Sequence, residues 1–274
     1  MALALDSSQT VLAPIVARRE VGEQAWVVEV EIDSISDDLR PGQFVMLSLA
    51  ENSPTVVARP FSFYDRPAAN RFTFLIQKMG KGTKALVEAP VGTMLRCLLP
   101  LGNGFDVAAA DKDVVMVAGG VGAAPFLMYA QQRIVLGSSE NTDMFFGGRS
   151  IAHLFDHQAF DQLGINMHYS TDDGSQGFKG NIIACLAADL DKKRISSNAV
   201  FVACGPSGLL HAFADFARLR NLDAYLSLET YMGCGFGVCN SCPVPTSIEG
   251  KYSDWPYAKT CSQGPVFSLS DISI

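Results

Sequence analysis

The chain has no excess of basic residues. Of its 274 residues, 21 are Lys or Arg and 28 are Asp or Glu, which gives a formal net charge of −7. Nucleic-acid-binding domains carry basic surfaces that attract phosphates, so this balance argues against a nucleic-acid partner. The length suits one large domain or two to three small ones, each with its own hydrophobic core.

Long uninterrupted apolar segments are also missing. The first twenty residues lack the basic start and the apolar core of an export signal, so we expect a cytoplasmic protein. The uncharged stretch VVMVAGGVGAAPFLMYA, residues 114–130, has 17 residues, fewer than the roughly 20 that a membrane-spanning helix needs. Glycines and a proline interrupt it. We interpret it as a buried strand, a glycine turn and a buried helix, and we expect no membrane association.

Cysteine is sparse until the C-terminal part of the chain. Cys97, Cys185 and Cys204 are scattered in apolar surroundings, where a cysteine usually acts as a small core residue. The other four of the seven cysteines follow residue 233. Without an export signal a disulfide framework is not expected, so this concentration indicates a metal or redox site.

Two patterns of apolar residues divide the chain. Residues 10–107 form short β-branched and aromatic runs between turn signals such as RPGQ and LGNG, which predicts a small antiparallel barrel. A short helical pattern occurs at residues 84–88. From residue 111 onward, strand and helix patterns alternate four times, one helix being expected over residues 151–163, and this alternation predicts a parallel sheet with crossover helices.

The C-terminal part has little periodicity and is rich in glycine and cysteine, so we expect something other than a hydrophobic core to hold it. The predicted fold is therefore multi-domain, β and α/β. An antiparallel barrel spans residues 1–107, a parallel α/β nucleotide-binding domain spans 108–223, and a small cysteine domain spans 224–274.

Two glycine-containing strand ends indicate a nucleotide site. In VAGGVGAAPF, residues 117–126, a strand runs into a helix through glycines, and free amides at such a helix start bind a pyrophosphate. A plain tight turn is the alternative, because the full G-x-G-x-x-G pattern is missing. VACGPSGLL, residues 202–210, ends another parallel strand and should lie at the same edge. The candidate residues are Gly119, Gly120, Gly122, Cys204, Gly205 and Pro206; a buried thiol is the alternative for Cys204 alone.

The barrel contains two further anion-binding features. ARPFSFYD, residues 58–65, places Arg59 on a strand, and LIQKMGKGTKAL, residues 75–86, places Gly80, Gly82 and Thr83 at a helix start. An arginine and a helix N-terminus both bind phosphates. Taken singly, each is equally a surface arginine or a plain turn.

The C-terminal cysteines follow a recognisable spacing. Cys234, Cys239 and Cys242 form C-x4-C-x2-C, and Cys261 follows after 18 residues, as in plant-type [2Fe–2S] proteins. The intervening glycines allow a loop to wrap a cluster and point amides at its sulfurs. A structural zinc is the alternative, although zinc sites favour paired C-x2–4-C units.

Taken together, R-P-x-S, G-x-G-T, G-G-x-G and C-G-P resemble the ferredoxin reductase superfamily, in which a barrel binds FAD and an α/β domain binds NAD(P). The resemblance implies that Arg59 meets the FAD phosphates and that Ser62 lies near the reactive flavin edge. Gly82 and Thr83 would hold the pyrophosphate. The other residues implied in flavin binding are Pro60, Phe61, Leu75, Ile76 and Gln77.

Within that superfamily the chain is similar to the electron-transfer subunits of NAD-dependent (class 1B) dihydroorotate dehydrogenases. PLGNGF at 100–105, TDDGSQGFKGNI at 171–182, SLETYMGCGFGVCNSC at 227–242 and CSQGPVF at 261–267 carry this resemblance, which covers about residues 10 to 267. The chain departs from the family in Phe63, where an aliphatic residue is more usual, and in a longer stretch between Cys242 and Cys261.

The resemblance implies a partner and an order of electron carriers. An FMN-containing dihydroorotate dehydrogenase catalytic subunit, in a heterotetramer of two plus two, would supply electrons through [2Fe–2S] and FAD to NAD⁺ in pyrimidine (UMP) synthesis. A flavin must stand between a two-electron nicotinamide and a one-electron cluster. None of the four histidines lies in a motif, so we expect no catalytic acid or base and no dihydroorotate oxidation by this chain alone.

Two alternatives remain at this point. One is the NAD(P)H:acceptor diaphorase subunit of a hydrogenase or of a ferredoxin:NAD(P) transhydrogenase. The other is a zinc- or nucleotide-binding regulator. The aromatic residues Tyr252, Trp255 and Tyr257 supply either an apolar partner face or a cover for the small domain.

Overall fold

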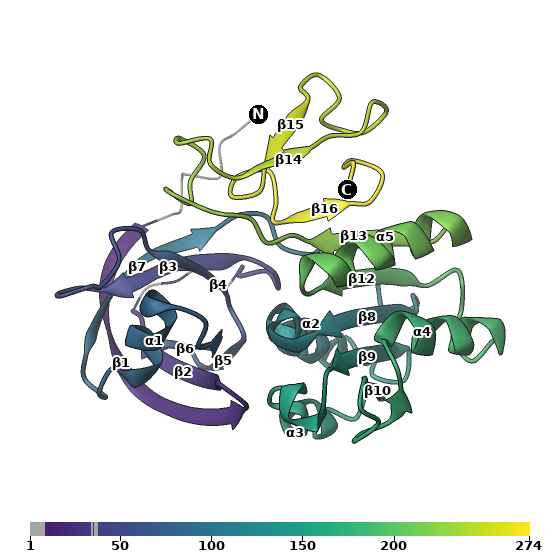
Figure 1. The fold of residues 1–274 in the computed structure, drawn as a ribbon, viewed down its shortest axis with the longest axis horizontal. Helices are drawn as coiled ribbons and strands as arrows, with labels where there is room; N and C mark the ends of the chain where they lie inside the picture. The colour runs from purple at the N-terminus through teal and green to yellow at the C-terminus, as the bar shows by residue number, and fades with distance from the viewer. Residues whose placement is uncertain (1–8, 34, 36–37) are drawn as a thin grey trace.

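The N-terminal part is a strongly curled antiparallel sheet, seen in a computed structural model that describes residues 9–33, 35 and 38–274 (Figure 1). All its strand pairs are antiparallel. In sheet order its strands are β4 (Arg59–Ser62), β3 (Phe44–Leu49), β7 (Met94–Leu101), β1 (Gln9–Gly22), β2 (Ala25–Glu31), β6 (Arg71–Gln77) and β5 (Asp65–Ala68).

The sheet curls until its two edge strands meet. β4 and β5 are consecutive in the chain, with only Phe63 and Tyr64 between them. The Tyr64 amide donates to the Thr73 carbonyl on β6 at 2.9 Å. The predicted barrel is therefore confirmed. Phe63 is fully buried inside it, 5.7 Å from the ring of Phe72, so the unusual aromatic residue fills the barrel core.

One helix, α1 (Lys81–Glu88), lies against β3 and β6. It begins at Gly80 and buries Leu86 and Val87 in the barrel core. The short helix expected near residues 84–88 is therefore present and begins three residues earlier.

The central part is a sheet that is parallel except at one edge. In sheet order its strands are β11 (Phe178–Lys179), β10 (Asn166–Thr171), β9 (Thr142–Gly148), β8 (Val114–Gly119), β12 (Val200–Cys204), β13 (Asp223–Ser227) and β16 (Val266–Ser268). Its helices are α2 (Ala124–Val135), α3 (His157–Asp161), α4 (Ile182–Asp191) and α5 (Ser207–Arg220). The predicted alternation is confirmed. The strand order reverses between β8 and β12, and ligands bind at such switch points.

Residues 114–130 form β8, a 3₁₀ turn over Gly120–Ala123 and the buried start of α2, as predicted. All six residues of β8 are buried. In residues 9–33, 35 and 38–274, no helix is long and apolar enough to cross a membrane.

The prediction of one continuous helix over residues 151–163 is wrong, because the helical segments there are short and interrupted. A 3₁₀ turn at Ile151–His153 and the five-residue α3 replace it. Asp156 separates them in a left-handed conformation, with φ 54° and ψ 28°, which a continuous α-helix does not accept. The apolar periodicity alone did not reveal this interruption.

The C-terminal part shares the core of the α/β sheet. The predicted boundary between residues 223 and 224 falls inside β13, and β16 pairs antiparallel with β13. Leu226, Val244, Phe267 and Ile272 belong to the core that α5 covers. The expectation that this part lacks a hydrophobic core was wrong, because its apolar residues are dispersed among turns and show no period.

A small hairpin completes this part. β14 (Pro243–Pro245) pairs antiparallel with β15 (Tyr257–Lys259). In Figure 1 this hairpin and the C-terminus lie together above the barrel and the α/β sheet.

Candidate functional site

A cavity of about 820 Å³ lies at the carboxyl ends of β8, β9, β10 and β12. Gly119, Gly120 and Pro206 line it, as predicted for a nucleotide site. Gln77 and Met79, which end β6 and follow it, contribute a wall from the barrel. The cavity is therefore bounded by both domains, and a nucleotide held in it would face the barrel.

The two predicted glycine turns contact each other directly. A Cβ atom on Gly122 would lie 2.2 Å from the Cys204 carbonyl oxygen and 2.5 Å from the Gly205 Cα. A Cβ on Gly205 would lie 3.2 Å from the Gly119 nitrogen. The prediction that these strand ends share one edge is confirmed, and glycine is required because backbone packs on backbone.

Sequence reasoning assigned no candidate residues to the part of the cavity built by β9 and β10. Gly147, Gly148 and Arg149 line it at the end of β9, and Ser170 and Asp172 line it at the end of β10. The Ser170 hydroxyl is buried and has no hydrogen-bond partner among the residues that the structure describes. Since buried polar groups are normally paired, this hydroxyl fits a polar ligand in the cavity.

Arg149 is held at the cavity wall by His153. Its Nη2 donates to His153 Nε2 at 2.6 Å, and His153 Nδ1 is 2.9 Å from the Ser150 hydroxyl. A guanidinium can only donate, so Nε2 is the acceptor and Nδ1 carries the proton that it shares with Ser150. This arrangement presents a fixed positive charge to an anionic ligand.

The flavin-binding candidates of the barrel lie together. A Cβ atom on Gly82 would be 3.6 Å from Arg59 Cγ, so the arginine lies against the start of α1. The Thr83 hydroxyl accepts hydrogen bonds from the Met79 and Gly80 amides at 2.9 and 3.0 Å. Arginine and helix start thus lie on one face, in which Thr83 shapes the turn, and the binding of FAD phosphates there stays a prediction.

The candidates on β4 and β6 differ in orientation. β4 carries Pro60, Phe61 and Ser62 beside β3, at one end of the strand order. On β6, Ile76 points into the barrel core, whereas Leu75 packs toward the α/β domain. Gln77 lines the nucleotide cavity. The flavin contacts of these residues stay predictions, and the side chain of Ile76 faces away from the cavity.

The four C-terminal cysteines form two pairs. The Cys234 amide donates to Cys239 Sγ and the Cys239 amide donates to Cys234 Sγ, both at 3.4 Å. The sulfurs of Cys242 and Cys261 are 3.2 Å apart. Two pairs suit a two-iron cluster, in which each iron takes two thiolates, better than a zinc ion with four thiolates around one centre.

Two of the four thiols are shifted toward the thiolate. Hydrogen bonding by Ser241, and then by the Cys234 amide, lowers the pKa of Cys239 to about 6. The hydrogen bond between Cys242 and Cys261 lowers the pKa of Cys242 to about 6 and raises the pKa of Cys261. Since the thiolate is the metal ligand, each pair contains one thiol that is shifted toward the ligating form.

The cysteine loop packs on the outside of the barrel. Cys242 and Cys261 share a buried apolar cluster with Phe44, Met46 and Leu101 of β3 and β7. Gly235 has φ 82°, and a Cβ there would lie 2.5 Å from Met46 Cγ. Met46 is also the cross-strand partner of Pro60. One side chain therefore separates the cysteine loop from the strand that carries the flavin-binding candidates.

Cys204 is a half-buried thiol beside polar groups that sequence reasoning missed. Burial, offset in part by a hydrogen bond with Ser227, raises its pKa to about 12. Glu229, which follows β13, raises it further. The thiol therefore stays protonated at neutral pH and acts at this strand end as a neutral group.

Known proteins share this arrangement. Residues 229–273 match the iron–sulfur cluster binding domain of dihydroorotate dehydrogenase B, and residues 116–215 match an oxidoreductase NAD-binding domain. The chain is 34% identical over 264 residues to a dihydroorotate dehydrogenase B (NAD(+)) electron transfer subunit from Shouchella clausii, covering 94% of this chain and 96% of the relative. The chain belongs to this family of electron transfer subunits. The match at 229–273 also decides between iron–sulfur and zinc in favour of iron–sulfur.

Other relatives and solved structures agree with the fold. The corresponding subunit from Geobacillus kaustophilus is 32% identical, with 94% of this chain and 96% of that protein covered. A structure of an NADH-dependent reduced ferredoxin-NADP oxidoreductase superposes with a TM-score of 0.81 at 26% identity, covering 97% and 91% of the two chains. The ferredoxin reductase of carbazole 1,9a-dioxygenase, at 19% identity, has a TM-score of 0.68 over 78% of this chain and 67% of that chain. It shares the fold alone.

The aromatic residues between Cys242 and Cys261 differ in exposure. The Tyr252 ring packs on Phe267 at 5.9 Å, and its hydroxyl donates to the Gln263 carbonyl at 3.3 Å. Tyr252 therefore covers the small domain. Trp255 and Tyr257 are 74% and 59% exposed, as a partner face requires.

Proposed function

We propose that this chain is the electron-transfer subunit of a dihydroorotate dehydrogenase complex, which passes electrons from a partner dehydrogenase to NAD⁺. The observation that carries the proposal is the order of the three sites. The barrel lies between the nucleotide cavity, which Gln77 borders, and the cysteine loop, which packs on Met46. This order is the one that two-electron and one-electron carriers require.

The chain's own residues bind and orient rather than transfer protons. When bound, a flavin exchanges electron pairs with a nicotinamide and single electrons with an iron–sulfur cluster. Arg59 and the start of α1 would hold the FAD phosphates, and Gly119–Gly122 with Ser170 would hold NAD. The four loop cysteines would hold [2Fe–2S], while the apolar contact with β3 and β7 keeps water away from Cys242 and Cys261.

The partner that fits is an FMN-containing dihydroorotate dehydrogenase catalytic subunit, in a complex of two plus two chains. Relatives are named electron transfer subunits of dihydroorotate dehydrogenase B, so they work beside another subunit. Exposed apolar side chains near the cysteine loop support a docking face, namely Tyr231, Val238, Trp255 and Tyr257. We place the complex in the reducing cytoplasm, where cysteine thiolates stay available to hold a cluster.

The experiment that tests this function is anaerobic purification with and without the partner. We expect flavin absorption, iron and acid-labile sulfide in the isolated chain. Dihydroorotate-dependent reduction of NAD⁺ should appear only after the partner is added. A colourless, zinc-loaded protein would contradict the proposal.

A second candidate is a diaphorase subunit of another redox complex. The 26% identical ferredoxin-NADP oxidoreductase structure favours it. In that case the flavin and cluster would be present, but the dihydroorotate dehydrogenase partner would neither bind nor transfer electrons to this chain. The same purification therefore separates the two candidates.

Asp172 is expected to set the preference for NADH over NADPH. The nicotinamide half must face the flavin, so the adenosine half extends toward β9 and β10, where Asp172 lines the cavity. A carboxylate there repels a 2′-phosphate. We expect Asp172→Asn to raise kcat/KM for NADPH relative to NADH by about tenfold. The matched control is Asp173→Asn, because this neighbouring side chain is exposed and hydrogen bonds to Ser175 instead. An unchanged ratio in Asp172→Asn would exclude the role.

A further inference from the structure

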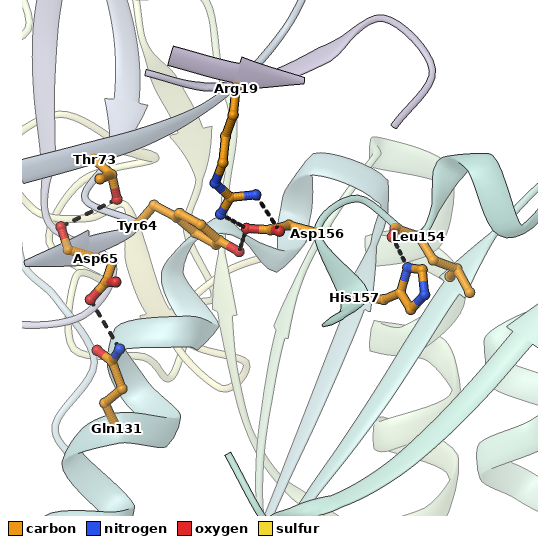
Figure 2. Close-up of polar contacts among 8 residues, drawn as sticks. All are labelled: Arg19, Tyr64, Asp65, Thr73, Gln131, Leu154, Asp156 and His157. Atoms are coloured by element: carbon orange, nitrogen blue, oxygen red, sulfur yellow. Dashed lines mark hydrogen bonds and ion pairs between the residues drawn. The ribbon is translucent and has the colours of Figure 1, made fainter. Parts of the chain in front are cut away.

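A polar cluster joins the barrel to the α/β domain next to a wall of the nucleotide cavity (Figure 2). Two of its residues are buried, while the Arg19 side chain is 55% exposed. The Asp156 carboxylate, before α3, accepts two hydrogen bonds from Arg19 of β1, with Nη1–Oδ1 at 2.7 Å and Nη2–Oδ2 at 2.5 Å. The Tyr64 hydroxyl, from between β4 and β5, donates to the same carboxylate at 2.8 Å. Asp156 is 8% exposed and Tyr64 is 1% exposed. We name these three residues the interdomain joint.

Backbone hydrogen bonds surround the interdomain joint. The Asp156 amide donates to the Val21 carbonyl at 3.0 Å, and the Glu23 amide donates to the Ala152 carbonyl at 2.9 Å. Between these two bonds, a Cβ on Gly22 would lie 2.6 Å from the Phe155 ring. The hairpin between β1 and β2 is therefore fastened to residues 152–156 by main chain, close packing and side chains.

The segment that the joint fastens is also a wall of the nucleotide cavity. Phe155 and His153 line that cavity, and Asp156 follows them directly. On the barrel side, the Gln24 carbonyl accepts the Lys78 amide at 2.7 Å, and the neighbouring Gln77 also lines the cavity. The joint therefore links the two walls through which the nucleotide cavity meets the barrel.

The geometry of the joint defines an orientation and not merely a contact. A bidentate arginine–carboxylate pair fixes two atoms on each side, so it is more specific than a single ionic contact. Burial and the Asp156 charge raise the pKa of Tyr64 well above its usual value, so its hydroxyl stays a donor. The left-handed backbone of Asp156 (φ 54°) is a conformation that Asp and Asn adopt more readily than other side chains.

We propose that Asp156, with Arg19 and Tyr64, is a positioning residue that sets the nucleotide cavity against the flavin face of the barrel. This inference rests on the proposed function. In that function a hydride, one hydrogen nucleus with its two electrons, leaves one ring and arrives on the other. Such a transfer requires near-contact of the reacting atoms, and a displacement of about 1 Å can cost a hundredfold in rate.

The test uses the FAD-loaded chain with NADH and a small dye acceptor. Asp156→Asn keeps the side-chain shape and the left-handed backbone, and Arg19→Met and Tyr64→Phe each remove one donor. We expect the double variant Asp156→Asn/Arg19→Met to lower kcat by about tenfold or more, with KM for NADH little changed because the strand ends that bind NADH are untouched. Hydrogen–deuterium exchange should quicken at the Glu23 and Asp156 amides.

Arg71→Met is the matched control. Arg71 pairs with Glu31 at 2.6 Å within the barrel, so its loss removes an ion pair without touching the joint. We expect wild-type kcat and wild-type exchange at Glu23 and Asp156 in this variant.

Two outcomes would overturn the inference: a wild-type kcat in the double variant, or a fall in kcat no larger than its loss of bound FAD. If the wild-type chain itself lacks NADH-dependent dye reduction, the proposed function fails. The exchange measurement still reports on the joint in that case, because it requires no turnover.

Discussion

Cys239→Ser is expected to remove the iron–sulfur cluster and leave FAD in place. Cys239 forms one of the two sulfur pairs with Cys234, and each sulfur accepts the amide of the other residue. A serine hydroxyl is a harder donor that ionises far less readily, whereas iron–sulfur clusters select soft thiolates. Cys239 is exposed, so its replacement leaves no hole in the core, and the barrel with its flavin face should fold normally.

Two activities should separate in this variant. NADH oxidation by a small dye should persist, because the nucleotide cavity and Arg59 lie apart from the cysteine loop. Transfer between the chain and its partner dehydrogenase should fall to background. Iron, sulfide and flavin analysis, with the electron paramagnetic resonance signal of the reduced protein, measures the loss of the cluster and the retention of FAD. Assays with the dye and with the partner measure the two activities.

Cys185→Ser is the control, because Cys185 is a buried thiol of the α/β core, distant from the loop in sequence. It should retain both the cluster and the transfer to the partner. If dye reduction disappears from a Cys239→Ser protein that still holds FAD, the order of the three sites is wrong.

The sequence pattern predicts the order of the barrel, the α/β sheet and the cysteine loop, because each depends on residues that are close in sequence. Strand and helix periods change at residue 111, and glycines mark the turns at Gly119–Gly122 and Cys204–Gly205. A cysteine spacing is equally local, since three ligands come from one loop. These features depend on neighbours in sequence, so the barrel, the α/β sheet and the presence of an iron–sulfur domain could all be predicted.

Features that depend on distant partners could not be predicted. Arg149, Ser170 and Asp172 become a site only because β9 and β10 end at the same edge as β8. The left-handed Asp156 is stabilised by Arg19, which is 137 residues away, so a helix pattern over residues 151–163 concealed it. The C-terminal apolar residues form a core only because β16 pairs with β13, and their spacing in the sequence does not show this pairing.

Arg133→Met is expected to destabilise the chain by about 2–3 kcal/mol, the cost of losing hydrogen bonds made by a buried charged group. Arg133 of α2 is fully buried. Its guanidinium donates to the carbonyls of Ala108, Ala109 and Lys112 at 2.8, 2.8 and 2.6 Å, and its Nε donates to the Thr142 hydroxyl at 3.1 Å. These carbonyls belong to the link between the barrel and β8. The loss of their hydrogen bonds should therefore loosen the chain where the two domains join.

Methionine fills similar space but donates nothing, so the carbonyls of the link and the buried Thr142 hydroxyl would lose these hydrogen bonds. Arg133→Lys keeps the charge but has fewer and differently placed donors. Its stability should lie between those of Arg133→Met and the wild type. The control is Arg220→Met, which breaks an exposed pair with Asp191 at 2.7 Å and should cost less than about 1 kcal/mol. Urea unfolding of the FAD-loaded protein measures all three, and equal midpoints for Arg133→Met and Arg220→Met would show that the link does not depend on Arg133.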